Sequence, residues 1–392
     1  MPSIYVDHAA TTPLSPAAFK AITSQLQELG NPSSLHTHGR ATRKALEDAR
    51  EAIAREVGMP VGMSTMIQVG LPKGNFAIAA GLLSTYEFEQ QIGNSLVVRE
   101  PLGVVGCITP WNYPLHQIAL KIAPAMAAGN TVVVKPSEVA PINAFILAEI
   151  IHAAGVPAGV FNLVTGVGPV VGEAIAAHPG VDMVSFTGST RAGKRVAVVA
   201  AENVKKVSLE LGGKSANLIF ADSDVDHAAA AAPGAVFDNS GQDCCARSRI
   251  LVQKSIFDRF MAGFEKSVKE YRVEDPNLDS SQMGPLVSKK QLETVQSYLN
   301  DKDDTVAFTG SAPSGAGYWM PPTVLLPKSV NARTWQEEIF GPVVSVLPFE
   351  DEAEAIELAN ASDYGLSGSI WTNDLGRAMR VSRAIESGNL SV

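Results

Sequence analysis

Two of the three cysteines in this 392-residue chain stand side by side, in the stretch DNSGQDCCARSR at residues 238–249. Adjacent Cα atoms lie about 3.8 Å apart across a trans peptide, below the roughly 4.4–6.8 Å of most disulfides, so a bond between Cys244 and Cys245 is disfavoured. A metal site is not indicated either, because no CxxC or HxxH spacing lies nearby and Cys107 is alone. The pair is therefore expected to contain a thiol that fills space, a reactive thiol, or one of each.

An acid and an amide elsewhere in the chain have surroundings that suit catalysis. Glu210 ends an apolar run in LELGGKS, between Leu209 and Leu211, where burial would raise its pKa toward the range of a general base. Asn112 lies between two prolines in TPWNYPL, where a rigid loop could hold its amide as a donor to an oxyanion. The alternatives are a glutamate that points out of its strand and an asparagine that caps its own turn.

Two further stretches suit a nucleotide. In VSFTGSTRAGKRVAVVAA a strand runs through Gly188 and Ser189 into a helix, which aims backbone N–H groups at an anion. In NTVVVKPSE, Glu138 follows a strand that ends at Lys135, where a carboxylate can bind a ribose diol and repel a 2′-phosphate, favouring NAD over NADP. The alternatives are an ordinary N-cap serine and a solvated ion pair. A second glycine-rich turn, at Gly166 and Gly168, does not fit GxGxxG.

The elements that must position these residues alternate between strands and helices. NTVVVKPSE predicts a buried strand, and PINAFILAEIIHAAG predicts a helix that ends at Gly155. SLVVREPLGVVGCITP predicts a hairpin that turns near Glu100-Pro101, and KKVSLELGGKSANLIFA predicts a pair of strands around a glycine turn. The alternation indicates an α/β fold with a mainly parallel, doubly wound sheet.

Composition narrows the class of protein. Hydrophobic residues make up 46% and aromatic residues only 6%, so large aliphatic cores in two or three domains are expected. The net charge of −9 argues against nucleic acid as the main partner. Three cysteines, and the absence of a signal-like start or a long apolar run, predict a globular cytoplasmic protein.

The motifs PWNYPL, KPSE, FTGST, LELGGKS, GQDC and EEIFGPV, in this order over about residues 59–392, resemble the aldehyde dehydrogenase superfamily. The resemblance implies a Rossmann-like NAD-binding domain at 59–212, with an oligomerisation hairpin at 83–101, and an α/β catalytic domain at 213–392. It also implies NAD-dependent oxidation of a small-molecule aldehyde to a carboxylic acid, through a cysteine thiohemiacetal and a thioester, in a protein family that forms homo-oligomers.

The same resemblance assigns roles to single residues. Cys244 matches the nucleophile, with a lowered pKa expected, and Cys245 its packed neighbour; Asn112 matches the oxyanion donor and Glu210 the general base. No metal ligand is implied. The residues implied for NAD binding are Trp111, Lys135, Ser137, Glu138, Gly168, Gly188, Ser189, Leu211, Glu338 and Phe340.

Residues 1–58 have a different texture. IYVDHAATTPLSP and the stretch after it resemble the N-terminus of cysteine desulfurases, with one helix expected from Ser15 to Gly30 and a second ending at Gly58. A join near Gly58 to a dehydrogenase shortened at both ends is therefore expected, with impaired turnover and a doubtful oligomer. The alternatives are a non-catalytic chimera or nucleotide-binding interaction module, and a cysteine desulfurase, which is disfavoured because the rest of the chain lacks that family's cofactor lysine.

Overall fold

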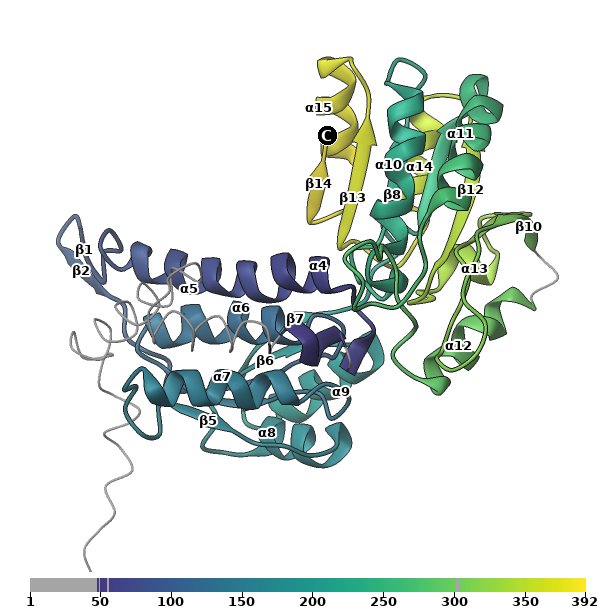
Figure 1. The fold of residues 1–392 in the computed structure, drawn as a ribbon. Helices are drawn as coiled ribbons and strands as arrows, with labels where there is room; N and C mark the ends of the chain where they lie inside the picture. The colour runs from purple at the N-terminus through teal and green to yellow at the C-terminus, as the bar shows by residue number, and fades with distance from the viewer. Residues whose placement is uncertain (1–47, 49, 55, 301–303) are drawn as a thin grey trace, which may run out of the picture. The chain divides into compact units, whose positions relative to one another are not determined.

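The computed structural model describes residues 48, 50–54, 56–300 and 304–392. They form two compact units, many of whose helices and strands are labelled in Figure 1. The first unit comprises Val61–Glu210 and the described residues up to Glu56, and the second comprises Val57–Pro60 and Leu211–Val392. The first helix expected from the sequence, Ser15 to Gly30, lies outside the described residues. The second is confirmed at its end, because helical backbone stops at Val57 and Gly58 has φ +75°.

The first unit is built on a five-stranded parallel sheet. Its strands lie in the order β5 (Phe161–Leu163), β4 (Thr131–Lys135), β3 (Val104–Ile108), β6 (Met183–Thr187) and β7 (Lys206–Glu210). The chain runs outward from β3 to β5 and then returns to the other side of β3 for β6 and β7. This reversal makes the carboxyl ends of β3 and β6 a topological switch point, where open α/β sheets bind ligands.

Helices cover both faces of this sheet. The helices are α6 (Pro114–Ala127), α7 (Ile142–Ala153), η2 (Gly168–Gly172), α8 (Glu173–Ala177) and α9 (Thr190–Ala201). Of these, α6 and α7 bury Ile118, Ile122 and Leu147 against β3 and β4. Helix α9 contacts β6 and β7. Because right-handed crossovers that run in opposite directions place their helices on opposite faces, α9 lies on the other face. The predicted buried strand and the helix ending at Gly155 (φ +75°) are confirmed.

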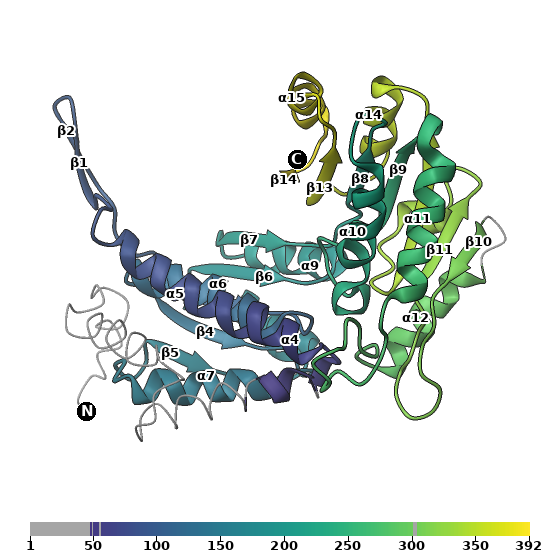
Figure 2. The ribbon, with the colours of Figure 1, turned by 45° about the horizontal axis from the view of Figure 1, so that its top comes forward.

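A long helical segment precedes the sheet. α4 (Val61–Met63), η1 (Ser64–Gly70) and α5 (Leu71–Leu82) follow one another with helical backbone at each junction (Figure 2). Just before it, the Glu56 carboxylate accepts hydrogen bonds from Ile142 N at 2.8 Å and Asn143 Nδ2 at 3.2 Å. Glu56 thereby satisfies the first turn of α7, whose own N-cap residue Pro141 offers no side-chain acceptor.

The predicted hairpin exists, but its partners were wrongly predicted. β1 (Glu89–Ile92) pairs antiparallel with β2 (Ser95–Val98), and the two-residue turn contains Gly93 at φ +59°. The segment Val104–Ile108, expected to pair with β2 across Glu100-Pro101, instead lies between β4 and β6. The Gly93-Asn94 turn was the stronger local signal, because a two-residue hairpin loop requires positive φ.

The second unit contains a seven-stranded sheet. The order is β10 (Asp304–Thr309), β11 (Thr323–Pro327), β12 (Val343–Phe349), β9 (Arg249–Gln253), β8 (Ala216–Ile219), β13 (Ser367–Trp371) and β14 (Asn389–Ser391). Only β10 and β11 pair antiparallel among these strands. The two strands expected around Gly212-Gly213 exist as β7 and β8, but they belong to different sheets, so no tight turn joins them. The mainly parallel α/β architecture is confirmed.

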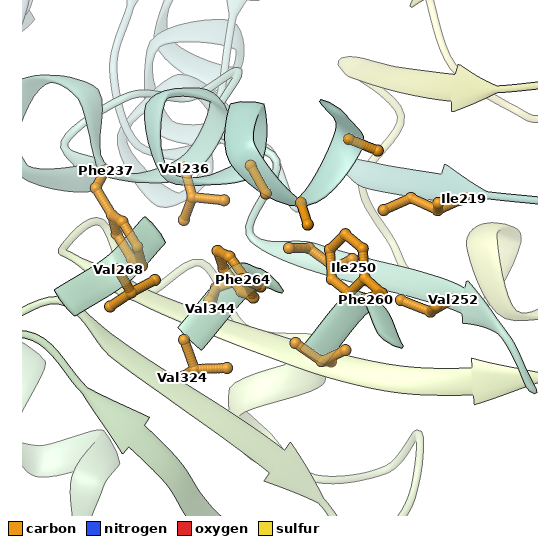
Figure 3. Close-up of a cluster of buried hydrophobic side chains, with 14 of the residues drawn as sticks. Ile219, Val236, Phe237, Ile250, Val252, Phe260, Phe264, Val268, Val324 and Val344 are labelled. Atoms are coloured by element: carbon orange, nitrogen blue, oxygen red, sulfur yellow. The ribbon is translucent and has the colours of Figure 1, made fainter. Parts of the chain in front are cut away.

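Side-chain alternation fills both faces of this sheet. Ile250 and Val252 of β9 join a cluster with Phe260 and Phe264 (Figure 3), whereas Leu251 joins a second cluster. The first cluster is covered by α10 (Val225–Phe237) and α11 (Phe257–Glu270), and the second by α13 (Arg333–Gln336), α14 (Glu352–Asn360) and α15 (Leu375–Ala384). The other helical elements described in this unit are η3 (Asp238–Gly241), η4 (Lys254–Ile256) and α12 (Lys289–Leu299).

Across the described part of the chain, no helix has both the length and the apolar composition needed to cross a membrane.

Candidate active site

The carboxyl edge of the five-stranded sheet collects most of the residues expected to bind a nucleotide. Ile108, at the end of β3, is in register with Lys135 on one side and with Phe186 on the other, and Thr187 is in register with Glu210. The segments that follow these strand ends therefore begin side by side. They carry Trp111, Asn112, Ser137, Glu138, Gly188 and Ser189.

Lys135, Glu138 and Gly168 lie together at this edge. Lys135 is 2% exposed, and its Nζ lies 2.9 Å from Glu138 Oε2. Burial raises the pKa of Glu138, but the hydrogen bond and charge of Lys135 and the backbone amide of Gly168 outweigh it and hold that pKa below its ordinary value. Glu138 is therefore an ionised acceptor at neutral pH. Ser137 is also buried, and its Oγ accepts a hydrogen bond from Val139 N at 3.3 Å.

The turn between β6 and α9 starts the helix through Ser189. Its Oγ accepts a hydrogen bond from Ala192 N at 3.3 Å, as an N-cap does. Gly188 N donates to Glu210 O at 3.0 Å, and a Cβ at Gly188 would lie 2.7 Å from the Phe186 ring. Glycine is thus required here by close packing, and the 12-residue helix presents its N-terminus at the edge of the sheet.

The sequence pattern did not single out two threonines at the switch point, Thr109 and Thr187. Thr109 directly follows β3 and is 3% exposed, and Thr187 is the last residue of β6 and is 7% exposed. Within the part of the chain that the structure describes, neither Oγ1 has a hydrogen-bond partner. Buried hydroxyls normally have a partner. The only available signal in the sequence was their position at the end of an apolar strand.

The two catalytic candidates of the first unit differ in environment. Asn112 is 4% exposed and lies in the short loop between β3 and α6, as a fixed donor requires. Glu210 is exposed at the end of β7, and its neighbours Leu209 and Leu211 are half-buried. Glu210 is therefore not buried between these leucines, and Leu209, which precedes it in β7, points to the opposite face of the strand.

In the second unit the candidate residues gather at the amino edge of the sheet. The segments 211–215, 244–248 and 338–342 lead into the neighbouring strands β8, β9 and β12. Arg249 N donates to Ser215 O at 3.2 Å, and Ser345 N donates to Ser248 O at 3.0 Å. The first links the segment before β8 to the start of β9, and the second links the segment before β9 to β12.

Two glycines hold Glu338 close to the cysteine loop. Gly213 N donates to Glu338 Oε1 at 3.0 Å, and a Cβ at Gly212 would lie 2.3 Å from Glu338 Oε2. A Cβ at Gly213 would lie 2.0 Å from the carbonyl oxygen of Cys244. Burial raises the pKa of Glu338, which the Gly213 amide and the charge of Lys214 partly offset.

Left-handed backbone precedes the cysteines. Asn239, Ser240 and Gly241 have φ of 51°, 60° and 67°, a conformation that costs roughly 1–2 kcal/mol per non-glycine residue. It is held by Ser240 Oγ, which donates to Gly284 O at 2.8 Å, and by Gln242 Oε1, which accepts from Val287 N at 2.9 Å. Strain held by surrounding contacts is frequent at functional sites. Phe340 is likewise at φ 58°.

The cysteines themselves depart from two expectations. Cys244 and Cys245 are both half-buried, so Cys245 is not a fully packed filler. The hydrogen bond of the Cys244 thiol to Cys245 and burial both raise the pKa of Cys244, whereas a lowered pKa was expected. The reason is the immediate surroundings, since the second thiol, Asp243 and Glu338 all disfavour a thiolate at Cys244.

The expected site residues are thus divided between the units. The first unit holds Asn112, Glu210 and the group around Lys135 and Gly188, and the second holds Cys244 with three residues expected to bind NAD, Leu211, Glu338 and Phe340. Cys244 and Glu338 are brought together through Gly212-Gly213, and Lys135, Glu138 and Gly168 through direct contacts.

Comparison with known proteins agrees with this fold and these motifs. The sequence model of the aldehyde dehydrogenase family matches residues 25–392. A 3-succinoylsemialdehyde-pyridine dehydrogenase from a Pseudomonas species is 46% identical over 358 residues, which are 89% of this chain and 75% of that protein. The chain belongs to the aldehyde dehydrogenase family.

Solved structures show the same likeness. A γ-glutamyl-γ-aminobutyraldehyde dehydrogenase from Burkholderia cenocepacia is 36% identical with a TM-score of 0.91, and the match covers 99% of this chain and 78% of that chain. A mutant aldehyde dehydrogenase C from Pseudomonas syringae, in complex with NAD+ and octanal, is 36% identical with a TM-score of 0.88, covering 98% and 79%.

The family match also corrects the expected N-terminal boundary. It begins at residue 25, within the segment 1–58 that was expected to come from a cysteine desulfurase. None of the comparisons described supports the desulfurase resemblance, and residues 1–47 lie outside those described.

Proposed function

We propose that this protein oxidises an aldehyde to a carboxylic acid with NAD as the hydride acceptor. The observation that carries the proposal is the Cys244 loop, which a strained left-handed turn, Gln242 and the Gly213 contact hold beside the Glu338 carboxylate. Family membership and the structure of a relative with bound NAD+ and octanal support it.

In the proposed reaction Cys244 is the nucleophile. The Cys244 thiol gives up its proton to water, and its sulfur forms a bond to the aldehyde carbon. The carbonyl oxygen becomes an oxyanion that the Asn112 amide and the Cys244 backbone N–H stabilise. Loss of one such donor typically costs about 10²–10³ in rate. When the oxyanion collapses, the carbon gives up a hydride and a thioester to Cys244 remains. Glu210 then takes a proton from water, which attacks the thioester and releases the acid and the thiol.

The residues at the carboxyl edge of the first sheet suit a dinucleotide. Thr109 and Thr187 leave buried hydroxyls without a partner among the described residues, and the N-terminus of α9 suits a pyrophosphate. Lys135 and Glu138 would bind the adenosine ribose, with Trp111, Ser137 and Gly168 beside it. Leu211, Glu338 and Phe340 would hold the nicotinamide half. When bound, NAD supplies the carbon centre that accepts the hydride.

The two units correspond in this proposal to a nucleotide-binding domain and a catalytic domain. The hairpin β1–β2 exposes Ile92, Leu96 and Val98 by 56%, 57% and 50%. Side chains of this kind suit pairing with a second copy of the chain, because an exposed apolar hairpin edge otherwise favours aggregation.

The decisive experiment separates nucleotide binding from chemistry. NAD binding is measured by fluorescence, and NADH formation is followed in a single turnover with a panel of aldehydes. We expect Cys244→Ala to bind NAD with an unchanged dissociation constant and to form no NADH, while Cys245→Ala, the matched control, still forms NADH. If the unmutated protein binds NAD but forms no NADH with any aldehyde, a nucleotide-binding protein without this activity is the better description. Activity that survives Cys244→Ala would overturn the assignment of the nucleophile.

A further inference from the structure

The cysteine loop brings together three side chains of the kinds that bind thiophilic metal ions. One donor atom each from Asp243, Cys244 and Cys245 lies within 4.8 Å of the other two. The sequence did not indicate this, because adjacent cysteines match no standard metal-ligand spacing. In the folded chain the two cysteines occupy a turn that is closed by a hydrogen bond from Ala246 N to Asp243 O at 3.1 Å.

We propose that this turn binds a thiophilic divalent cation, with zinc as the natural candidate, through the sulfurs of Cys244 and Cys245 and the carboxylate of Asp243.

The spacing of the sulfurs fits such an ion. With Zn–S bonds of about 2.3 Å and a tetrahedral angle, two ligating sulfurs lie roughly 3.8 Å apart. The Cys244 and Cys245 side chains are hydrogen-bonded to each other, and their sulfurs lie within 4.8 Å of one another. A metal ion held by both sulfurs would therefore require only a small movement of the two side chains.

The third ligand is fixed by the same turn. Asp243 Oδ1 accepts a hydrogen bond from Cys245 N at 2.8 Å, so the carboxylate is held on the side of the turn that carries the sulfurs. Three protein ligands leave one position of a tetrahedral ion for water or another small ligand, as in open zinc sites.

Charge balance also suits a divalent ion. Arg247 is half-buried, and its Nη1 donates to Cys245 O at 2.5 Å and to Ser367 Oγ at 2.8 Å. Two thiolates and a carboxylate carry three negative charges, which a divalent ion and this guanidinium together neutralise. Without the ion, three ionised ligands in a half-buried turn would repel one another.

The consequence for activity rests on the proposed function. A metal ion that holds the Cys244 sulfur removes the nucleophile, so zinc would inhibit the dehydrogenase reversibly and a chelator would restore it. The binding itself depends only on the turn. The test therefore measures binding directly.

Cadmium is a suitable probe, because cadmium thiolates absorb in the ultraviolet by sulfur-to-metal charge transfer. Reduced, metal-free protein is titrated with cadmium, and we expect one equivalent to bind with a charge-transfer band that added zinc displaces. Cys245→Ser should lower cadmium affinity at least tenfold and roughly halve the band, since one of two sulfurs is lost. Asp243→Asn should weaken binding without changing the band. Cys107→Ala is the matched control, because Cys107 is fully buried elsewhere, and it should bind cadmium as the unmutated protein does.

Two outcomes would overturn the proposal. One is an unchanged cadmium affinity and band in Cys245→Ser, and the other is a failure of the unmutated protein to bind cadmium with a charge-transfer band. Lack of NADH formation by the unmutated protein would instead count against the proposed function, and the cadmium titration would remain readable.

Discussion

Lys135 Nζ and Glu138 Oε2 lie 2.9 Å apart at the carboxyl end of β4, and the lysine is almost completely buried while the glutamate side chain is 45% exposed. The carboxylate therefore faces outward at the edge where a ribose is proposed to bind, and its charge disfavours a 2′-phosphate. We expect Glu138→Gln to lower the ratio of the NADP dissociation constant to the NAD dissociation constant by about tenfold, equivalent to about 1.4 kcal/mol.

Glu138→Ser is the companion variant, because it removes the contact with Lys135 as well as the charge. It should also narrow the preference for NAD, but should weaken the binding of both nucleotides more than Glu138→Gln does. The dissociation constants are measured by fluorescence titration. A ratio that stays the same in both variants would show that Glu138 does not select between the nucleotides.

A methyl group at Gly213 should displace the nucleophile. The added Cβ would lie 2.0 Å from the carbonyl oxygen of Cys244, so the cysteine loop must move. Since a shift of about 1 Å in a catalytic group can cost on the order of 10²-fold in rate, we expect Gly213→Ala to lower kcat by about that factor and to leave the NAD dissociation constant nearly unchanged.

Gly81→Ala is the matched control for Gly213→Ala. It lies in α5, where nothing would lie within 4 Å of the added Cβ, so kcat should not change. Thermal melting of both variants checks that the fold is kept. Full activity of Gly213→Ala would mean that the loop accommodates the methyl group.

Lys214 should make the stability of the protein depend on pH. It is 1% exposed, and burial together with the charge of Arg249 lowers its pKa from 10.5 to about 7, although Glu338 partly offsets this. The folded pKa is below the unfolded pKa, so the unfolded chain binds more protons between these two values. The cost of burying the lysine is therefore complete below about pH 7 and declines as the pH rises toward 10.5.

The matching measurement is urea unfolding between pH 7 and pH 9. The free energy of unfolding should rise more steeply with pH in the unmutated protein than in Lys214→Met. The difference between the two slopes should be at most about 1.4 kcal/mol per pH unit. Lys266→Met, which removes an exposed lysine on α11, should keep the slope of the unmutated protein. An unchanged slope in Lys214→Met would contradict the shifted pKa.

The three cysteines should separate by reactivity. Cys107 is fully buried, and burial raises its pKa to about 12, whereas Cys244 and Cys245 are half-buried. We expect a thiol reagent to label only the adjacent pair in the folded protein and to reach Cys107 after unfolding. Mass spectrometry of the labelled peptides identifies the sites, and native labelling of Cys107 at a rate similar to that of the pair would refute its burial.

Much of the fold and of the candidate site followed from local sequence. The apolar run at residues 132–134 predicts a buried strand, because a strand covered on both faces is apolar at successive positions. Gly155 and Gly58 end helices because glycine adopts positive φ without strain. The motif order identified the family, and Cys244, Asn112 and Glu210 were named from motifs a few residues long.

The tertiary structure decided which of these segments are neighbours. The contact of Gly213 with the Cys244 carbonyl joins residues that are far apart in the chain, and it exists because β8 and β9 are adjacent strands. The tertiary structure also decided which strand pairs with β2, because the residue pattern of β2 itself does not specify its partner. The raised pKa of Cys244 was also beyond the sequence, because desolvation and charge depend on the groups that surround a thiol in three dimensions and not on the residue types of its motif.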